Sequence, residues 1–197
     1  DAADRFMVEA SKLALDLALP TESQGTQLLA QPDREITWVR RLYEKAVGGF
    51  YKVVLAEQGW RVATGSFQGW QVSQQTAGIK NILPRMQTDI VLEHAARGRR
   101  IVIDTKFTSL LTAGWYRDEI IRSAYVYQIY AYLRSQADAG NPLTDSAAGL
   151  LLHPSIGDTH DETVVIQGHP IRFATVDLRA TPKDIRARLL DMIKYPF

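Results

Sequence analysis

The sequence predicts an α/β fold in which helices cover the faces of a mixed central β-sheet. Three observations lead to this prediction: a long apolar stripe at helical spacing, two β-branched runs joined by a short connection, and a further alternation of helix and strand patterns. The chain has 197 residues, 46% of them hydrophobic, which is enough to fill a sizeable core. We therefore expect residues 1–197 to form a single domain.

The N-terminal part of the chain is expected to be mainly helical. Apolar residues recur at helical spacing within residues 10–17, and a short apolar stretch at 28–30 could pair at a sheet edge. A long helix is predicted from Asp33 to Glu57, because apolar residues form a continuous stripe along it. Gly48 and Gly49 inside it each cost about 1 kcal/mol of helix stability, which predicts close packing against a neighbouring element.

A β-hairpin between residues 89 and 106 is the most informative local pattern. Two runs rich in Ile and Val flank a connection, residues 93–99, that contains glycine and several charged residues. An antiparallel return of this length brings Asp89 back beside Asp104. Because strand side chains alternate with period two, Asp104 and Lys106 should point to the same face of the sheet.

The remaining elements are predicted from shorter patterns. The last helix is expected to begin at Pro182, with Thr181 as its N-cap. Before it, Gly140 to Pro142 breaks the chain between a helix and a group of strands. The helix is predicted at residues 118–136, and strands are predicted at 60–63, 70–73, 148–153, 163–167 and 171–177.

Composition excludes several classes of protein. Cysteine is absent, so disulfides and thiolate zinc sites are excluded and any metal must be held by O or N ligands. The four histidines have no metal-binding spacing, and no phosphate-binding GxxxxGK[ST] loop occurs. No apolar run approaches the roughly 18 residues of a membrane span, and no signal peptide is visible, so we expect a cytoplasmic protein without membrane contact. The net charge of +1 argues against a strongly basic coat for nonspecific DNA binding.

The carboxylates of the hairpin suggest metal-dependent phosphodiester hydrolysis. One or two Mg²⁺ ions held by hard oxygen ligands neutralise the phosphate, activate a water and stabilise the leaving oxygen. Asp89 and Asp104 would supply oxygens, the backbone carbonyl of Thr105 could add another, and Lys106 would orient or help deprotonate the attacking water. The alternative is a solvated Asp–Lys pair on an exposed strand, worth less than about 1 kcal/mol. The hairpin pattern alone leaves both interpretations open.

A family resemblance favours the catalytic interpretation. Residues 81–90 and 101–107 resemble the nuclease core of McrC-like proteins, the cleavage subunits of McrBC restriction systems, in the PD-(D/E)xK nuclease superfamily. The resemblance continues in residues 42–45, 127–133 and 149–154, in the same order along the chain. In this sequence Thr88 replaces the proline before Asp89, and the second acid is Asp104 rather than Glu. Neither departure removes a ligand.

The resemblance implies a fold, an activity and partners. It implies a PD-(D/E)xK restriction-endonuclease-like core and a Mg²⁺-dependent DNA endonuclease, with Mn²⁺ as a substitute, acting on double-stranded DNA. The activity would belong to a GTP-driven complex that cleaves DNA containing methylcytosine, in which a separate McrB-like AAA+ GTPase reads the base and dimerisation allows double-strand cleavage. McrC-like proteins carry a further N-terminal region that engages the GTPase, and nothing here matches it. We therefore expect this chain to be the C-terminal part of a longer one.

Further site residues are expected around the hairpin. Glu44 would be a metal ligand or an orienter of Lys106, or else a solvated helix carboxylate. Gln128 would bond an active-site carboxylate, Lys106 or a phosphate, or else be an amide satisfied at the helix boundary. Arginine side chains could hold DNA phosphates: Arg85, Arg100, Arg117 and Arg122.

Two other functions remain open at this stage. One is a repair or junction nuclease of the same superfamily that works without a motor. The other is a non-catalytic subunit that uses the nuclease fold to stimulate an AAA+ ring. The presence of Asp89, Asp104 and Lys106 together argues against the second function, because a retired site usually loses a ligand or the lysine.

Overall fold

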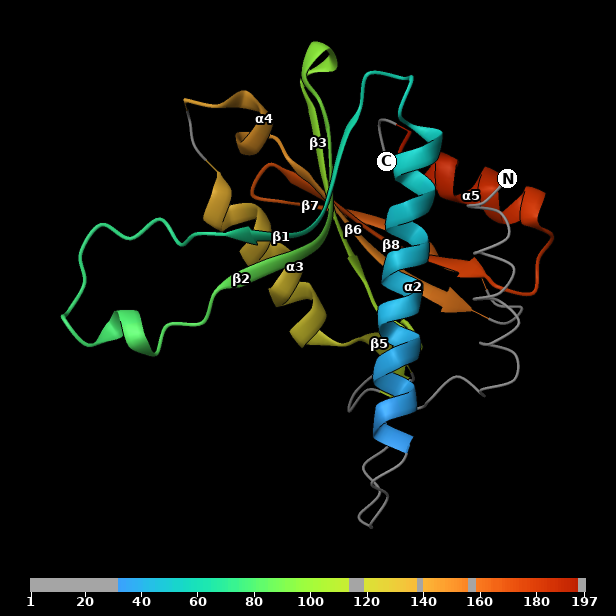
Figure 1. Ribbon diagram of the computed structural model, residues 1–197, viewed down its shortest axis with the longest axis horizontal. Helices are drawn as coiled ribbons and strands as arrows, with labels where there is room; N and C mark the ends of the chain where they lie inside the picture. Colours follow the sequence, from blue (N-terminus) through green and yellow to red (C-terminus); the bar gives the residue numbers. More distant parts are fainter. Residues whose placement is uncertain (1–31, 114–118, 138–139, 156–158, 195–197) are drawn as a thin grey trace.

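A mixed six-stranded sheet forms the centre of the protein (Figure 1). The computed structural model describes residues 32–113, 119–137, 140–155 and 159–194. The strand order is β1-β2-β3-β6-β8-β7; β2 runs antiparallel to both β1 and β3, β3, β6 and β8 are parallel, and β7 returns antiparallel to β8. The strands are β1 Arg61–Gln68, β2 Met86–His94, β3 Arg99–Thr105, β6 Ala148–Ser155, β7 Asp161–Ile166 and β8 His169–Asp177.

Helices cover both faces of this sheet. The long α2 (Pro32–Val54) and α5 (Pro182–Met192) pack on one face, and α3 (Ser123–Gln136) packs on the other, followed by the short α4 (Pro142–Asp145). Two single-turn 3₁₀ helices, η1 (Ile79–Asn81) and η2 (Ala95–Arg97), lie in the connections on either side of β2. A separate ribbon pairs β4 (Leu111–Ala113) with β5 (Glu119–Ile121). The predicted α/β class with a mixed central sheet is confirmed.

The alternation of side chains along β3 divides the core into two layers. Ile101 and Ile103 point toward α2 and α5, whereas Val102 points toward α3. Two glycines allow the helices to approach closely. A Cβ on Gly48 of α2 would lie 2.8 Å from Thr64 of β1, and a Cβ on Gly149 of β6 would lie 2.8 Å from Ile129 of α3. The expected close packing is thus present at Gly48, while a Cβ on Gly49 would meet no atom within 4 Å.

Several element boundaries differ from the sequence predictions. Helix α2 ends at Val54 rather than at residue 57, and a single strand, β1, replaces the two strands predicted at 60–63 and 70–73. Residues 70–73 were predicted as a strand because of their alternation, but their side chains are exposed and no sheet neighbour pairs with them. The second helix begins at Ser123 instead of residue 118, after the short strand β5. The features predicted for residues 10–17 and 28–30 lie outside the described residues.

The predicted start of the last helix is confirmed. Pro182 occupies the first turn of α5, and the side chain of Thr181 accepts a hydrogen bond from the backbone N–H of Asp184 at 3.2 Å. Among helices in the described residues, none is long and apolar enough to cross a membrane.

Candidate active site

The antiparallel pairing of β2 and β3 brings the two predicted acids together. Ile90 pairs with Ile103, so one step further along the ladder Asp89 lies across from Asp104. On the other side of β2, Thr64 pairs with Ile90 and Ser66 with Thr88, which places Gly65 across from Asp89. Gly65 has a φ of +62°, a conformation that favours glycine, and the ladder is interrupted there. The strand carrying Asp89 therefore loses its regular pairing at the site itself.

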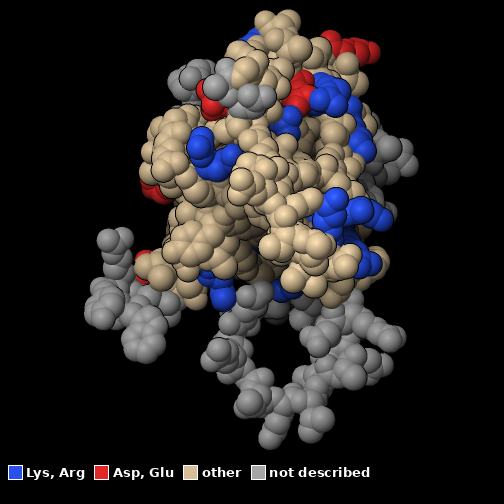
Figure 2. Space-filling view, turned by 90° about the vertical axis from the view of Figure 1, so that its left-hand side faces the viewer, with Lys and Arg blue, Asp and Glu red and all other residues tan. Residues whose placement is uncertain are grey.

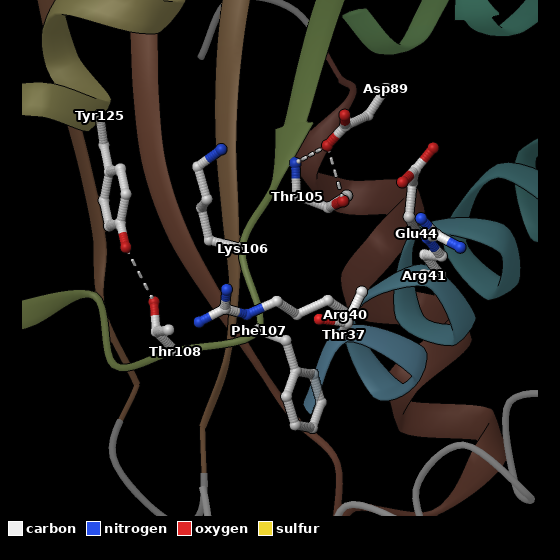
Figure 3. Close-up of a pocket in the computed structure, with 10 residues that line it drawn as sticks. All are labelled: Thr37, Arg40, Arg41, Glu44, Asp89, Thr105, Lys106, Phe107, Thr108 and Tyr125. Atoms are coloured by element: carbon white, nitrogen blue, oxygen red, sulfur yellow. Dashed lines mark hydrogen bonds between the residues drawn. The ribbon is translucent and has the colours of Figure 1, made fainter. Parts of the chain in front are cut away.

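Asp89 is held in place by the residue that follows Asp104. One oxygen of its carboxylate, Oδ2, accepts hydrogen bonds from the backbone N–H of Thr105 at 2.7 Å and from the Thr105 hydroxyl at 2.8 Å (Figure 3). These two bonds fix the carboxylate in one orientation, because both donors belong to a residue of the central sheet. The carbonyl of Thr105 was expected as a metal ligand. The structure shows, in addition, that the N–H and hydroxyl of this residue orient Asp89.

Asp104 is a fully buried carboxylate beside a lysine. The ammonium nitrogen of Lys106 lies 2.7 Å from its Oδ2, without the geometry of a hydrogen bond, and neither carboxylate oxygen has a hydrogen-bond partner among the described residues. Burial raises the pKa of Asp104 from 3.8 to about 6, and the nearby Lys106 opposes this increase only in part. Because burial outweighs the effect of Lys106, a further cation would stabilise this carboxylate in its charged form.

Lys106 is held between the acids and an aromatic ring. Its ammonium nitrogen lies 5.3 Å from the centroid of the Tyr125 ring, at the start of α3. Burial alone lowers the pKa of Lys106, but Asp104 and Asp89 outweigh it, and the net pKa is raised. Lys106 is therefore a cation at neutral pH. This charge state suits orientation of a water or stabilisation of negative charge better than acceptance of a proton.

Glu44 faces the same site from α2. Its carboxylate is partly buried, and its pKa is raised first by this burial and then by the negative charge of Asp89. It lies with Thr37 and Arg41 on one side of the helix, since these positions are separated by four and three residues. The placement brings Glu44 to the acids, as expected, although it lies beside the apolar stripe of the helix rather than on it.

A pocket of about 380 Å³ opens at this site, and the fully buried Asp104 is not among its lining residues (Figure 3). Asp89, Thr105 and Lys106 line it from the sheet side, and α2 contributes Glu44 opposite them. The other lining residues include two arginines of α2 that sequence reasoning missed, as well as residues after β3 and at the start of α3: Thr37, Arg40, Arg41, Phe107, Thr108 and Tyr125. The helical spacing of Arg40 and Arg41 relative to Glu44 was the signal that could have found them.

Gln128 reaches the site through a neighbour. Its amide nitrogen donates to the hydroxyl of Tyr132 at 2.7 Å, one helical turn further along α3. The pKa of Tyr132 is raised mainly by burial, and the charges of Asp104, Asp89 and Lys106 also act on it. The structure thus brings Gln128 near the acids with Tyr132 between them, in place of the direct contact that was expected.

Three of the four arginines expected at DNA are described by the structure, and none of these three lines the pocket. Arg85 is exposed just before β2, with its guanidinium carbon 5.7 Å from the centroid of the Phe67 ring. Arg100 lies near the start of β3, about 13 Å of strand away from Asp104, and is paired with Glu93. Arg122 is the residue before α3 and is partly buried. Arg117 lies outside the described residues.

The residue types at the site fit a hard divalent cation. Within the described residues, no group of three or more His, Asp or Glu side chains is gathered closely enough to hold a metal ion by protein atoms alone. Mg²⁺, however, usually takes only one or two carboxylates and keeps several waters. The buried carboxylate of Asp104 and the fixed carboxylate of Asp89 match that requirement.

The mixed sheet, with two acids and a lysine gathered at its central hairpin, defines a domain with a restriction-endonuclease-like core. Comparison with known proteins makes this class more specific. A family model described as McrBC 5-methylcytosine restriction system component matches residues 38–152, more than half of the chain. The chain belongs to this family, and its resemblance to McrC-like proteins is confirmed.

A curated relative supports the same assignment. It is the "Type IV methyl-directed restriction enzyme EcoKMcrBC" of Escherichia coli (strain K12), which is 24% identical over 188 residues. The alignment covers 95% of this chain and 52% of the relative, so the chain spans about half the length of the curated relative it matches.

Proposed function

We propose that this chain is a Mg²⁺-dependent DNA endonuclease domain that hydrolyses phosphodiester bonds. The observation that carries the proposal is the gathering of Asp89, Asp104 and Lys106 at the central hairpin, where Asp89 and Lys106 line the pocket and the buried carboxylate of Asp104 lies 2.7 Å from the Lys106 ammonium. Burial of an ionisable carboxylate costs stability even with a lysine beside it, so a fold that keeps one is expected to use it.

Each residue of the pocket has a distinct part in the proposed reaction. Asp89 and Asp104 would hold Mg²⁺, which neutralises phosphate charge and lowers the pKa of a water when bound. Thr105 keeps Asp89 oriented through its two hydrogen bonds. Lys106, as an ammonium, would orient the attacking water and offset charge on the phosphate as it becomes pentacovalent. Glu44 would add a carboxylate from α2, directly or through a water.

The basic residues of the pocket wall would bind DNA. Arg40 and Arg41 line the pocket across from Lys106, where their guanidinium groups can hold the phosphates that flank the scissile one (Figure 3). Arg85 lies four residues before Asp89 and would hold the backbone further along. The pocket therefore offers acids for the metal and cations for the substrate, with one acid and at least one cation on each wall.

The family and the curated relative extend the proposal to a restriction complex. The relative is named as a methyl-directed restriction enzyme, and the family is described as a component of a 5-methylcytosine restriction system. We infer that this chain is the cleavage part of such a complex and acts on double-stranded DNA containing methylcytosine. Base recognition and GTP-driven movement would lie with an AAA+ partner, and dimerisation would provide a site for each strand.

Calorimetric titration of Mn²⁺ or Mg²⁺ into the metal-free protein tests the site directly. We expect saturable binding to the wild type and no binding to Asp104→Ala. The matched control is Glu162→Ala, which removes an exposed carboxylate from β7. It should leave metal binding unchanged.

The titration, together with assays of GTPase stimulation and of DNA cleavage, separates the two alternatives. A wild-type protein that binds no metal, yet stimulates a GTPase ring, would be a non-catalytic subunit. A protein that binds metal and cuts branched DNA efficiently without GTP or a partner would be a junction or repair nuclease. Metal binding that survives in Asp104→Ala would show that the proposed site is wrong.

A further inference from the structure

The connection between β1 and β2 forms an arm that extends away from the rest of the domain (Figure 1). The arm comprises residues 69–85 and includes the short helix η1. None of its residues is buried, so it contributes nothing to the hydrophobic core. A segment of this length without a core role is usually retained for binding.

Hydrogen bonds nevertheless give the arm a defined shape. The indole nitrogen of Trp70 donates to the carbonyl of Pro84 at 2.8 Å and so links the two limbs. At its base, the amide of Gln136, at the end of α3, donates to the carbonyl of Gly69 at 2.9 Å. Gln71 donates back to the carbonyl of Ala137 at 3.2 Å. These bonds join the two limbs and tie them to the end of α3, so the arm is anchored at its base.

Large apolar side chains on the arm are exposed to solvent. Ile82 is 77% exposed, Leu83 39% and Trp70 40%. Exposed apolar residues that cluster on one projection mark an interaction site more often than chance surface residues do. Ile82 and Leu83 follow η1 directly, which places them together with Pro84 on the returning limb.

The charge of the arm indicates which kind of partner it would bind. From residue 58 to residue 88 the chain contains no acidic residue, although the whole chain has 22. Lys80 and Arg85 are basic, and most other polar residues are hydrogen-bonding amides and hydroxyls, notably Gln71, Gln74 and Gln75. Cations and amides without acids are suited to the phosphates and sugars of nucleic acid. The face of the molecule that carries the arm has a largely uncharged centre, with basic groups on both sides of it and acidic groups mainly toward the top (Figure 2).

The arm is continuous with the catalytic strand. Arg85 is the last residue before β2, and Asp89 is the fourth residue of that strand. A strand rises about 3.3 Å per residue, so Arg85 lies roughly 13 Å from Asp89 along the chain. This is within the width of a DNA duplex, so a duplex at the pocket can extend to the arm.

We propose that the arm grips double-stranded DNA beside the scissile phosphate. Lys80 and Arg85 hold backbone phosphates, and Ile82 and Leu83 lie against the sugars and base edges of the minor groove, where apolar side chains of other proteins insert. The inference rests on the proposed DNA endonuclease function and adds a binding surface that is separate from the metal site. It assigns the arm to duplex DNA rather than to a second copy of the chain or a protein partner.

Fluorescence anisotropy with a labelled duplex of about 30 base pairs, in the absence of divalent metal, tests the proposal. The duplex is used with and without methylcytosine, because phosphate contacts do not depend on the base. Three double variants of the 197-residue chain are compared with the wild type. They are Lys80→Gln with Arg85→Gln, Ile82→Ser with Leu83→Ser, and a control, Lys183→Gln with Lys194→Gln, in and after α5.

The basic arm variant is expected to bind about 10- to 100-fold more weakly near 0.1 M salt. Its plot of log affinity against log salt should be shallower by about 1.8, since each lost phosphate contact removes about 0.9. The apolar variant should lose about 10-fold without a change in slope. The control should bind duplex like the wild type. All variants should have the melting temperature of the wild type, because the changed side chains are exposed.

Each result decides between the two proposals. Arm variants that bind duplex as tightly as the wild type overturn the arm proposal. The same holds if these variants lose only self-association or binding to a protein partner. Metal-dependent nicking by those same variants would then leave the nuclease proposal intact. A wild type that binds no duplex and nicks no plasmid overturns both.

Discussion

Replacing Asp104 by asparagine should change the stability of the metal-free protein in a pH-dependent way. Relative to the wild type, the variant should gain stability as the pH rises from acid to neutral. The carboxylate is fully buried, and burial raises its pKa from 3.8 to about 6. The folded state therefore takes up a proton more readily than the unfolded state between these two values. As the pH rises through this window the wild type loses stability, because the ionised carboxylate is better solvated when the chain is unfolded. Asparagine carries no such charge.

The size of the effect follows from the pKa difference. A shift from 3.8 to about 6 corresponds to about 3 kcal/mol when the carboxylate is fully ionised in both states. At about pH 4.5 the Asp104 carboxyl destabilises the folded state by only about 1 kcal/mol, because it is then protonated in the folded protein. The stability difference between Asp104→Asn and the wild type should therefore move in favour of the variant by about 2 kcal/mol between about pH 4.5 and pH 7.5.

Urea unfolding in a metal chelator measures this change. The free energy of unfolding of each protein is measured at both pH values. The result is how the difference between the two proteins changes with pH. This removes every cost of the substitution that does not change with pH, such as altered packing around the new amide. A difference that stays constant within about 0.5 kcal/mol, or that moves toward the wild type with rising pH, would refute the reasoning.

Other substitutions test other parts of the site. Lys106→Met should reduce plasmid nicking by about 100-fold or more while Mn²⁺ binding persists; loss of metal binding would instead make Lys106 part of the metal site. Glu44→Gln should weaken Mn²⁺ binding in calorimetry by about 10-fold, and an unchanged affinity would leave Glu44 as a solvated helix carboxylate. Gly65→Ala forces a side chain into a φ of +62° and should cost about 1 kcal/mol in urea unfolding, with weaker Mn²⁺ binding because Asp89 lies across from it. Gly149→Ala brings a methyl to 2.8 Å from Ile129 and should cost about 1–3 kcal/mol without changing the affinity for metal, whereas wild-type stability would show that α3 moves away freely.

Local signals in the sequence were sufficient for the elements at the centre of the site. The hairpin carrying Asp89 and Asp104 has β-branched strands and a glycine-containing connection, and its register follows from the length of that connection. Thr181 and Pro182 mark the start of α5 by a capping pattern that needs no tertiary information. These features depend on residues that are neighbours in the chain or across one turn.

Features that depend on tertiary placement could not be predicted in the same way. Helical spacing places Arg40 and Arg41 beside Glu44, but they reach the pocket only because α2 packs across the sheet with Gly48 close to β1. Arg100 was expected to be near the acids, but it lies at the other end of β3 and pairs with Glu93. Residues 70–73 alternate like a strand, yet they extend into the arm, where no other strand can pair with them. Each difference concerns the position of an element relative to others, which sequence periodicity does not contain.

Nicking of supercoiled plasmid by the purified chain tests the central claim most directly. The wild type, Asp104→Ala and the control Glu162→Ala are compared over a range of enzyme concentrations, with Mg²⁺ and with a chelator. We expect nicking by the wild type and by the control in Mg²⁺ only, even if high enzyme concentration is needed, and no nicking by Asp104→Ala. Equal nicking by Asp104→Ala, nicking in the chelator, or no nicking by the wild type at any Mg²⁺ concentration would contradict the proposed nuclease site.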